Sequence, residues 1–108
     1  VHFQHVSTAI SFDAIRKAKV EGLPITCETA PHYIALCDEA LLEYGTLAKM
    51  NPPLRSEADR QATIAAVADG TVDLLATDHA PHTMEEKELG FLDAQRHHRP
   101  RVRLWRVP

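Results

Sequence analysis

"VDLLATDHAPHT" (residues 72–83) joins a mostly apolar run to an acid and two histidines. A short apolar run that ends in turn residues is typical of a buried strand. Asp78 would then lie at the mouth of the strand, where a carboxylate is costly unless it is paired, hydrogen-bonded or bound to a metal. A structural alternative is that Asp78 caps the segment from Thr83 onward or forms the turn before Pro81. His82 favours a functional interpretation, because both side chains could face one pocket.

The rest of the chain alternates between strand-like and helix-like patterns. Continuous apolar strands that alternate with amphipathic helices predict βαβ units and a parallel sheet, which is an α/β fold. The predicted strands cover residues 1–6, 23–29 and 71–77, and the predicted helices cover residues 11–22, 37–45 and 56–70.

Two serines are predicted to begin helices. Ser11 is a plausible N-cap of the first helix. Ser56, with Asp59 three residues later, resembles a capping box at the start of the last helix. The apolar face predicted for that last helix consists of Ile64, Ala65 and Ala68.

Polar residues that could take part in catalysis or ligand binding follow each predicted strand. They are His5 after the first strand, Glu28 and His32 after the second, and Asp78 and His82 after the third. Ligands of α/β proteins bind at the carboxyl ends of parallel strands, so three strands that end this way predict a site. A lone histidine at a strand end is nevertheless often structural.

One histidine and one aspartate form only a partial metal site. A catalytic zinc usually has three or more protein ligands, and the chain contains no HxH, HExxH or clustered cysteine pattern. Asn51, before Pro52 and Pro53, is either a turn residue or an amide that a rigid corner presents to a polar substrate.

Composition indicates an ordinary globular protein. The 108 residues are 44% hydrophobic and 25% charged. No apolar run approaches the roughly 20 residues that a membrane-spanning helix needs, and no membrane partner is expected. Cys27 and Cys37 form no disulfide framework, which favours a reducing cytoplasm. Because residue 1 is Val and begins inside a predicted strand, we expect a piece of a longer protein.

Four motifs together resemble the class I, bacterial-type dihydroorotases of the amidohydrolase superfamily. The resemblance covers about residues 1–94, and "NPPLR" with "TAPHY" favours dihydroorotase over the allantoinases and hydantoinases that share "TDHAPH". The motifs are HVSTA (5–9), ETAPHY (28–33), NPPLR (51–55) and ATDHAPHT (76–83).

This resemblance implies a fold, a reaction and roles for four residues. The fold is a (β/α)8 TIM-type barrel, of which this chain supplies about strands six to eight. His5 would be the metal ligand that ends strand six, and Asp78 the ligand that ends strand eight, with Zn²⁺ as the usual metal. Asp78 would also be the catalytic base of cyclic amide hydrolysis. Asn51 and His82 would contact dihydroorotate or carbamoyl-aspartate.

The family's other metal ligands would lie before Val1, so we expect the isolated chain to be inactive. The resemblance implies a cytoplasmic enzyme of pyrimidine biosynthesis, as a homodimer or with an aspartate transcarbamoylase. Two alternatives stay open. One is an allantoinase or hydantoinase, against which Asn51 argues. The other is a non-catalytic dihydroorotase-like subunit, which should have lost His5 and Asp78.

Residues 95–108 differ from the rest in charge. Residues 1–94 carry 15 acids and seven Lys or Arg, a net charge of −8, whereas the tail carries five Arg and no acid. One codon choice for the tail, read in a shifted frame, encodes a family-like Asn-Gly-Ile-Thr-Gly-Leu-Glu-Cys. We therefore expect an out-of-frame, disordered tail. The alternative is an Arg-rich arm for nucleic acid, against which the acidic body argues.

Overall fold

The structure is a computed structural model that describes residues 1–80, 82–93 and 104–106. Strands and helices alternate through most of this range. In chain order the elements are β1 (His2–Phe3), α1 (Ala9–Val20), β2 (Thr26–Thr29), α2 (Pro31–Ala35), α3 (Ala40–Tyr44), the 3-10 helix η1 (Gly45–Ala48), α4 (Glu57–Ala68), β3 (Leu74–Ala76), α5 (Met84–Lys87) and β4 (Leu104–Arg106).

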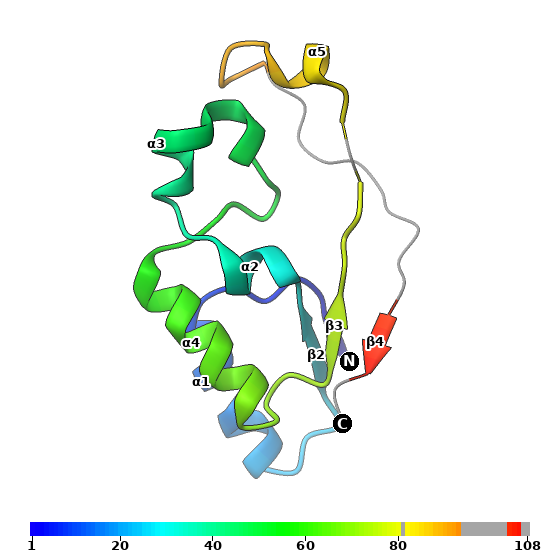
Figure 1. Cartoon of the computed structure of the whole chain (residues 1–108). Coiled ribbons are helices and arrows are strands. Elements are labelled where there is room, and N and C mark those ends of the chain that lie inside the picture. Colours follow the sequence, from blue (N-terminus) through cyan, green and yellow to red (C-terminus); the bar gives the residue numbers. More distant parts are fainter. Residues whose placement is uncertain (81, 94–103, 107–108) are drawn as a thin grey trace.

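The strands form a sheet in the order β1-β2-β3-β4. The first two pairings are parallel, with His2 opposite Thr26 and Glu28 opposite Leu74. These pairings confirm the predicted α/β arrangement of parallel strands joined through helices. The chain after β3 rises away from the sheet toward α5 (Figure 1).

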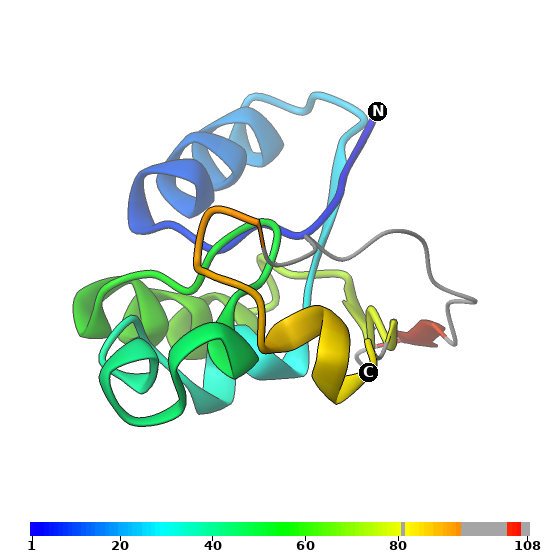
Figure 2. The same cartoon turned by 90° about the horizontal axis from the view of Figure 1, so that it is seen from above.

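Helices α1 and α4 pack against each other on one face of the strands, as both views show (Figures 1 and 2). The core between the helices and the strands is small, with Phe12 and Cys27 fully buried. A second apolar cluster lies under α2 and α3. It consists of Ala30, Tyr33, Ala40, Ala48 and Leu54.

Helix α1 begins earlier than predicted. Its N-cap is Thr8, whose hydroxyl accepts a hydrogen bond from the Ser11 amide at 3.4 Å. The prediction that Ser11 caps this helix is therefore wrong. Thr8 has extended backbone and a short hydroxyl side chain, so it meets the same capping requirements three residues earlier.

Helix α4 begins where the sequence predicts, because Ser56 accepts a hydrogen bond from the Asp59 amide at 3.2 Å. Its predicted buried face is wrong, since Ala65 and Ala68 are exposed and the buried residues are Thr63 and Ala66. Thr63 is tolerated in the core because its hydroxyl donates to the Asp59 carbonyl at 2.9 Å. A prediction of buried residues from hydrophobicity alone misses such a threonine.

Helix α2 lies outside the three predicted helices. Pro31 occupies the first turn of α2, where the missing amide hydrogen costs nothing because that amide would have no helical partner. Tyr33 of this helix is buried and belongs to the candidate site described below.

The tail includes one described element. Leu104–Arg106 form β4, which pairs antiparallel with β3. We expected disorder throughout residues 95–108, so a strand within this range differs from that expectation. Residues 95–103 and 107–108, the rest of that expectation, lie outside the described residues. Within the described ranges, no helix has the length and apolar character to span a membrane.

Candidate functional site

His5 and Asp78 share an unusual backbone conformation. His5 has φ of +54° and Asp78 has φ of +46°, and among the described residues they are the non-glycine positions with positive φ. Left-handed backbone is strained for side chains with a Cβ, although Asp and His adopt it more readily than most residues. Such strain concentrates at functional sites. Both residues predicted to bind metal therefore stand out geometrically.

The two residues also occupy equivalent places in the sheet. His5 follows β1, Asp78 follows β3, and Glu28 of β2 belongs to the strand between them. Because all three strands run parallel, these positions lie toward the same edge of the sheet.

A buried carboxylate lies beside the His5 ring. Nδ1 of His5 is 3.6 Å from Oε1 of Glu28, whose side chain is 4% exposed. Nε2 of His2 is 3.1 Å from the other oxygen, Oε2. A carboxylate that faces one ring nitrogen of a histidine leaves the other nitrogen available as a ligand. The sequence placed Glu28 at a strand end but assigned it no role.

Hydrogen bonds hold the backbone after β1 in this position. The Val6 amide donates to the Glu28 carbonyl at 2.9 Å, and the Thr29 hydroxyl donates to the Val6 carbonyl at 2.7 Å. Both bonds tie the residue that follows His5 to β2. The strained conformation of His5 is thus fixed by its neighbours.

Tyr33 connects Asp78 to the segment that follows Asn51. Its hydroxyl donates to the Pro52 carbonyl at 2.7 Å. Burial raises the pKa of Tyr33 well above its usual range, and the negative charge of Asp78 raises it further, while Arg55 opposes the shift. Asp78 and Arg55 are therefore both close enough to act electrostatically on this ring.

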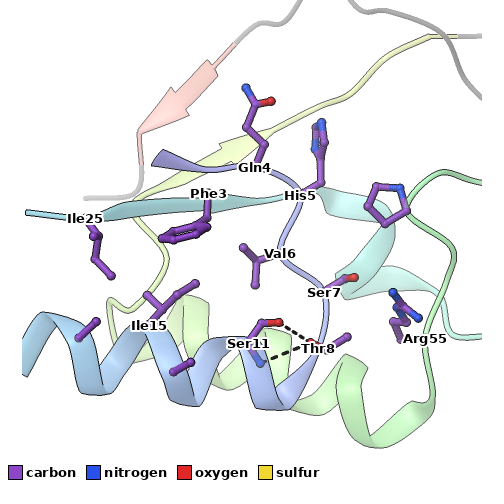
Figure 3. Close-up of a pocket in the computed structure, with 13 residues that line it drawn as sticks. Phe3, Gln4, His5, Val6, Ser7, Thr8, Ser11, Ile15, Ile25 and Arg55 are labelled. Atoms are coloured by element: carbon purple, nitrogen blue, oxygen red, sulfur yellow. Dashed lines mark hydrogen bonds between the residues drawn. The ribbon is translucent and has the colours of Figure 1, made fainter. Parts of the chain in front are cut away.

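A cavity of about 580 Å³ lies between β1 and α1. Its wall is mainly apolar, and Phe3 and Val6 point into it from the strand side (Figure 3). His5, Pro52 and Arg55 also line it. In Figure 3 the His5 ring points away from α1.

Asn51 and His82 lie apart from this cavity. Asn51 is exposed and borders a second cavity of about 300 Å³, which Phe91 also lines. His82 is partly buried, with Nδ1 3.2 Å from Oε2 of Glu86.

The local structure after β3 tests the alternative that Asp78 caps the segment from Thr83 onward or forms the turn before Pro81. Thr83 is the N-cap of α5, and it forms a full capping box with Glu86. Asp78 is therefore not the cap of this helix. Pro81, the other part of that alternative, lies outside the described residues. Within the described ranges there is no group of three or more His, Cys, Asp or Glu side chains placed to hold a metal ion. The structure thus brings Asp78 near Tyr33 without assembling a complete ligand set.

Curated proteins with sequences similar to this chain are dihydroorotases. The chain is 59% identical over 91 residues to the dihydroorotase of Desulfotalea psychrophila, which covers 84% of this chain and 22% of that protein. It is 54% identical over 94 residues to the dihydroorotase of Geobacter metallireducens, covering 87% and 22%. The chain thus spans about a fifth of the length of these relatives. No family model matches it.

Similar solved structures are hydantoinases. A D-hydantoinase superposes with a TM-score of 0.78 at 28% identity, over 86% of this chain and 22% of that one. The L-hydantoinase of Arthrobacter aurescens gives 0.77 at 30% identity, over 85% and 20%. The arrangement of strands and helices in this chain is therefore one found within the larger chains of these hydantoinases.

Proposed function

We propose that this chain is part of a dihydroorotase, which hydrolyses the cyclic amide of dihydroorotate and interconverts it with N-carbamoyl-aspartate. The observation that carries the proposal is the 53–59% identity to dihydroorotases over about 84% of the chain. Identity to the hydantoinases of known structure is 28–30% for the two described above. The sequence is therefore much more similar to these dihydroorotases than to these hydantoinases.

The fold supports a place within a (β/α)8 barrel. Three consecutive parallel strands, with α1 and α4 on one face, are the repeating arrangement of such a barrel. On this proposal β1, β2 and β3 are strands six, seven and eight, and the strand-end residues face the site where substrate binds.

His5 and Asp78 are proposed to hold a zinc ion together with ligands from the rest of the protein. Imidazole nitrogen and carboxylate oxygen are donors that Zn²⁺ accepts, and the Glu28 carboxylate next to Nδ1 suits a ligand bond from the other His5 nitrogen. The residues present therefore fit a metal in part. When bound, zinc supplies the Lewis acidity that polarises the amide carbonyl and activates water.

Asp78 has the chemistry of a general base in this reaction. Its carboxylate takes a proton from the attacking water and then delivers that proton to the departing ring nitrogen. The left-handed backbone holds the carboxylate beyond the end of β3, and no described side chain is within ion-pair distance of it. It is thus available for proton transfer.

Asn51 and His82 are proposed to bind the substrate. An amide donates and accepts hydrogen bonds, which suits the polar edge of dihydroorotate, and an imidazole can donate to its carboxylate. Both residues are on loops that the sheet and short helices support, where binding residues are commonly found.

The test is to express the complete protein encoded at the locus of this chain and to assay it with dihydroorotate, hydantoin and allantoin. We expect kcat/KM for dihydroorotate to exceed the other two by at least about tenfold. A preference for hydantoin or allantoin would instead indicate a hydantoinase or an allantoinase. No turnover of any substrate would favour a non-catalytic subunit, and the same preparation would then be tested for binding to an aspartate transcarbamoylase.

A further inference from the structure

Lys87 is buried at the end of α5, with 5% of its surface exposed. Its ammonium donates a hydrogen bond to the Lys49 carbonyl at 2.8 Å, and that bond is itself buried. No carboxylate of the described residues forms an ion pair with it. Burial lowers the pKa of Lys87, and the nearby Lys49 charge lowers it further. A charge in this setting is costly, so the position demands an explanation beyond packing.

Three further contacts join the same two segments. The Thr46 hydroxyl donates to the Lys87 carbonyl. In the opposite direction, the Lys49 ammonium donates to the Phe91 carbonyl at 2.5 Å and lies 5.2 Å from the centre of the Phe91 ring. We call Lys49 and Lys87, with these bonds, the lysine latch. It fastens the segment after η1 to α5 and the turn that follows it.

Each end of the latch is next to a proposed substrate residue. Lys49 is two residues before Asn51, and both border the cavity of about 300 Å³ that Phe91 also lines. Lys87 follows His82 within one short structured segment. In this segment Glu86 forms the capping box of α5 with Thr83, and its Oε2 is 3.2 Å from Nδ1 of His82. The latch therefore links the Asn51 loop to the His82 loop across 38 residues of sequence.

We propose that Lys87 is a positioning residue, which sets the Asn51 and His82 loops at the separation that substrate binding requires. This inference rests on the proposed function. A methionine would fill the same volume without a buried charge, so packing alone does not require lysine. What methionine lacks is the directed hydrogen bond to the Lys49 carbonyl, and that bond fixes one loop relative to the other.

The test replaces Lys87 with methionine in the complete protein. We expect KM for dihydroorotate to rise about tenfold, kcat to stay within about threefold, and zinc content by elemental analysis to be unchanged. The matched control is Lys17→Met, which changes an exposed lysine on α1 and should alter none of the three. An unchanged KM in Lys87→Met, with or without a lower melting temperature, would overturn the positioning role.

A double-mutant cycle separates positioning from an independent effect. If Lys87 acts through Asn51, the variant Lys87→Met with Asn51→Ala should have the KM of Asn51→Ala alone. If KM of the double variant instead rises by the product of the two single-variant increases, that coupling is refuted. If Lys87→Met does not fold, Thr46→Val removes one bond of the same junction and should raise KM in the same direction; an unchanged KM there also overturns the proposal. Wild-type protein that does not turn over dihydroorotate would instead refute the proposed function.

Discussion

His5 and Asp78 show how residue type and backbone conformation can point to the same positions. Each was predicted from its place after an apolar strand, and each adopts left-handed backbone in the structure. Strain at one surface residue has many explanations. Strain at both predicted ligands, at corresponding strand ends, is the pattern expected where a protein holds side chains for chemistry.

Asp78→Asn in the complete protein is expected to abolish nearly all turnover. The amide keeps the size of the side chain but cannot accept the water proton, and general acid–base steps contribute roughly 10²–10⁴-fold. The control is Asp13→Asn, an exposed acid on α1, which should retain full activity. Initial rates with dihydroorotate decide the matter, and an Asp78→Asn rate within about threefold of wild type would refute the assigned role.

Asn51→Ala is expected to raise KM for dihydroorotate while the metal content stays constant. Asn51 is exposed beside a cavity, which suits a substrate contact rather than a ligand. A hydrogen bond to a charged group is worth about 1.5–3 kcal/mol, so KM should rise by at least about tenfold. Kinetics and elemental analysis are measured on one preparation. Loss of zinc with unchanged KM would contradict the prediction.

Tyr33 should make the folded state of the complete protein sensitive to alkaline pH. Its pKa is raised above the ordinary value of 10.0, first by burial and then by the Asp78 charge. The unfolded chain therefore loses this proton first, so its contribution to stability is fully present below pH 10 and declines as pH rises further. Urea unfolding of Tyr33→Phe at pH 8 and above pH 10 should show a smaller alkaline loss than wild type. Tyr44→Phe is the comparison: its half-exposed ring has a pKa raised mainly by a hydrogen bond with Glu43, and its loss should remove less of the alkaline effect than Tyr33→Phe does.

At the scale of elements, local signals predicted the helices better than their buried faces. Ser56 and the apolar residues after it located α4, because capping depends on neighbours within three positions. Its buried face includes Thr63, whose burial depends on a backbone bond within the helix and on the elements that cover it. Helix α2 was missed for a similar reason, since a proline can open a helix as readily as it ends a strand.

The capping box of α5 gives an element-scale prediction. Thr83→Ala removes the hydroxyl that accepts from the Glu86 amide and should cost about 1 kcal/mol. Thr83→Ser keeps the hydroxyl and should cost much less. Hydrogen exchange at the Glu86 and Lys87 amides, with urea unfolding of the complete protein, measures both. Equal protection in Thr83→Ala and wild type would show that tertiary contacts alone hold α5.

At the scale of the whole molecule, the site depends on contacts that local sequence patterns do not predict. Glu28 meets His2 and His5, and Lys87 meets Lys49, across long stretches of sequence. The parallel arrangement of the strands and the edge at which polar residues gather could be predicted, because the carboxyl ends of parallel strands lie at one edge of a sheet. Which side chains meet there depends on register and on the packing of α2 and α5, and these are set by the folded chain as a whole.

The isolated 108-residue chain is predicted to lack dihydroorotase activity and a cooperative melt. It spans about a fifth of its relatives' length, and its described residues include only His5 and Asp78 of the proposed ligands, fewer than a catalytic zinc usually has. Apolar side chains along β1 and α1 are also exposed, including Phe3, Ile10 and Val20. The purified chain is assayed with added zinc and examined by near-UV circular dichroism during heating.

Three outcomes of this experiment have different meanings. No turnover and no sharp transition would agree with the prediction, since a small core leaves little stability once chain entropy is counted. A folded but inactive chain would refute the prediction about folding and leave the catalytic argument intact. Turnover near that of the complete protein, together with a cooperative melt, would mean that His5 and Asp78 find the remaining ligands within this chain or in a second copy of it. Sedimentation of the active chain would then distinguish those two sources, because only the second requires an oligomer.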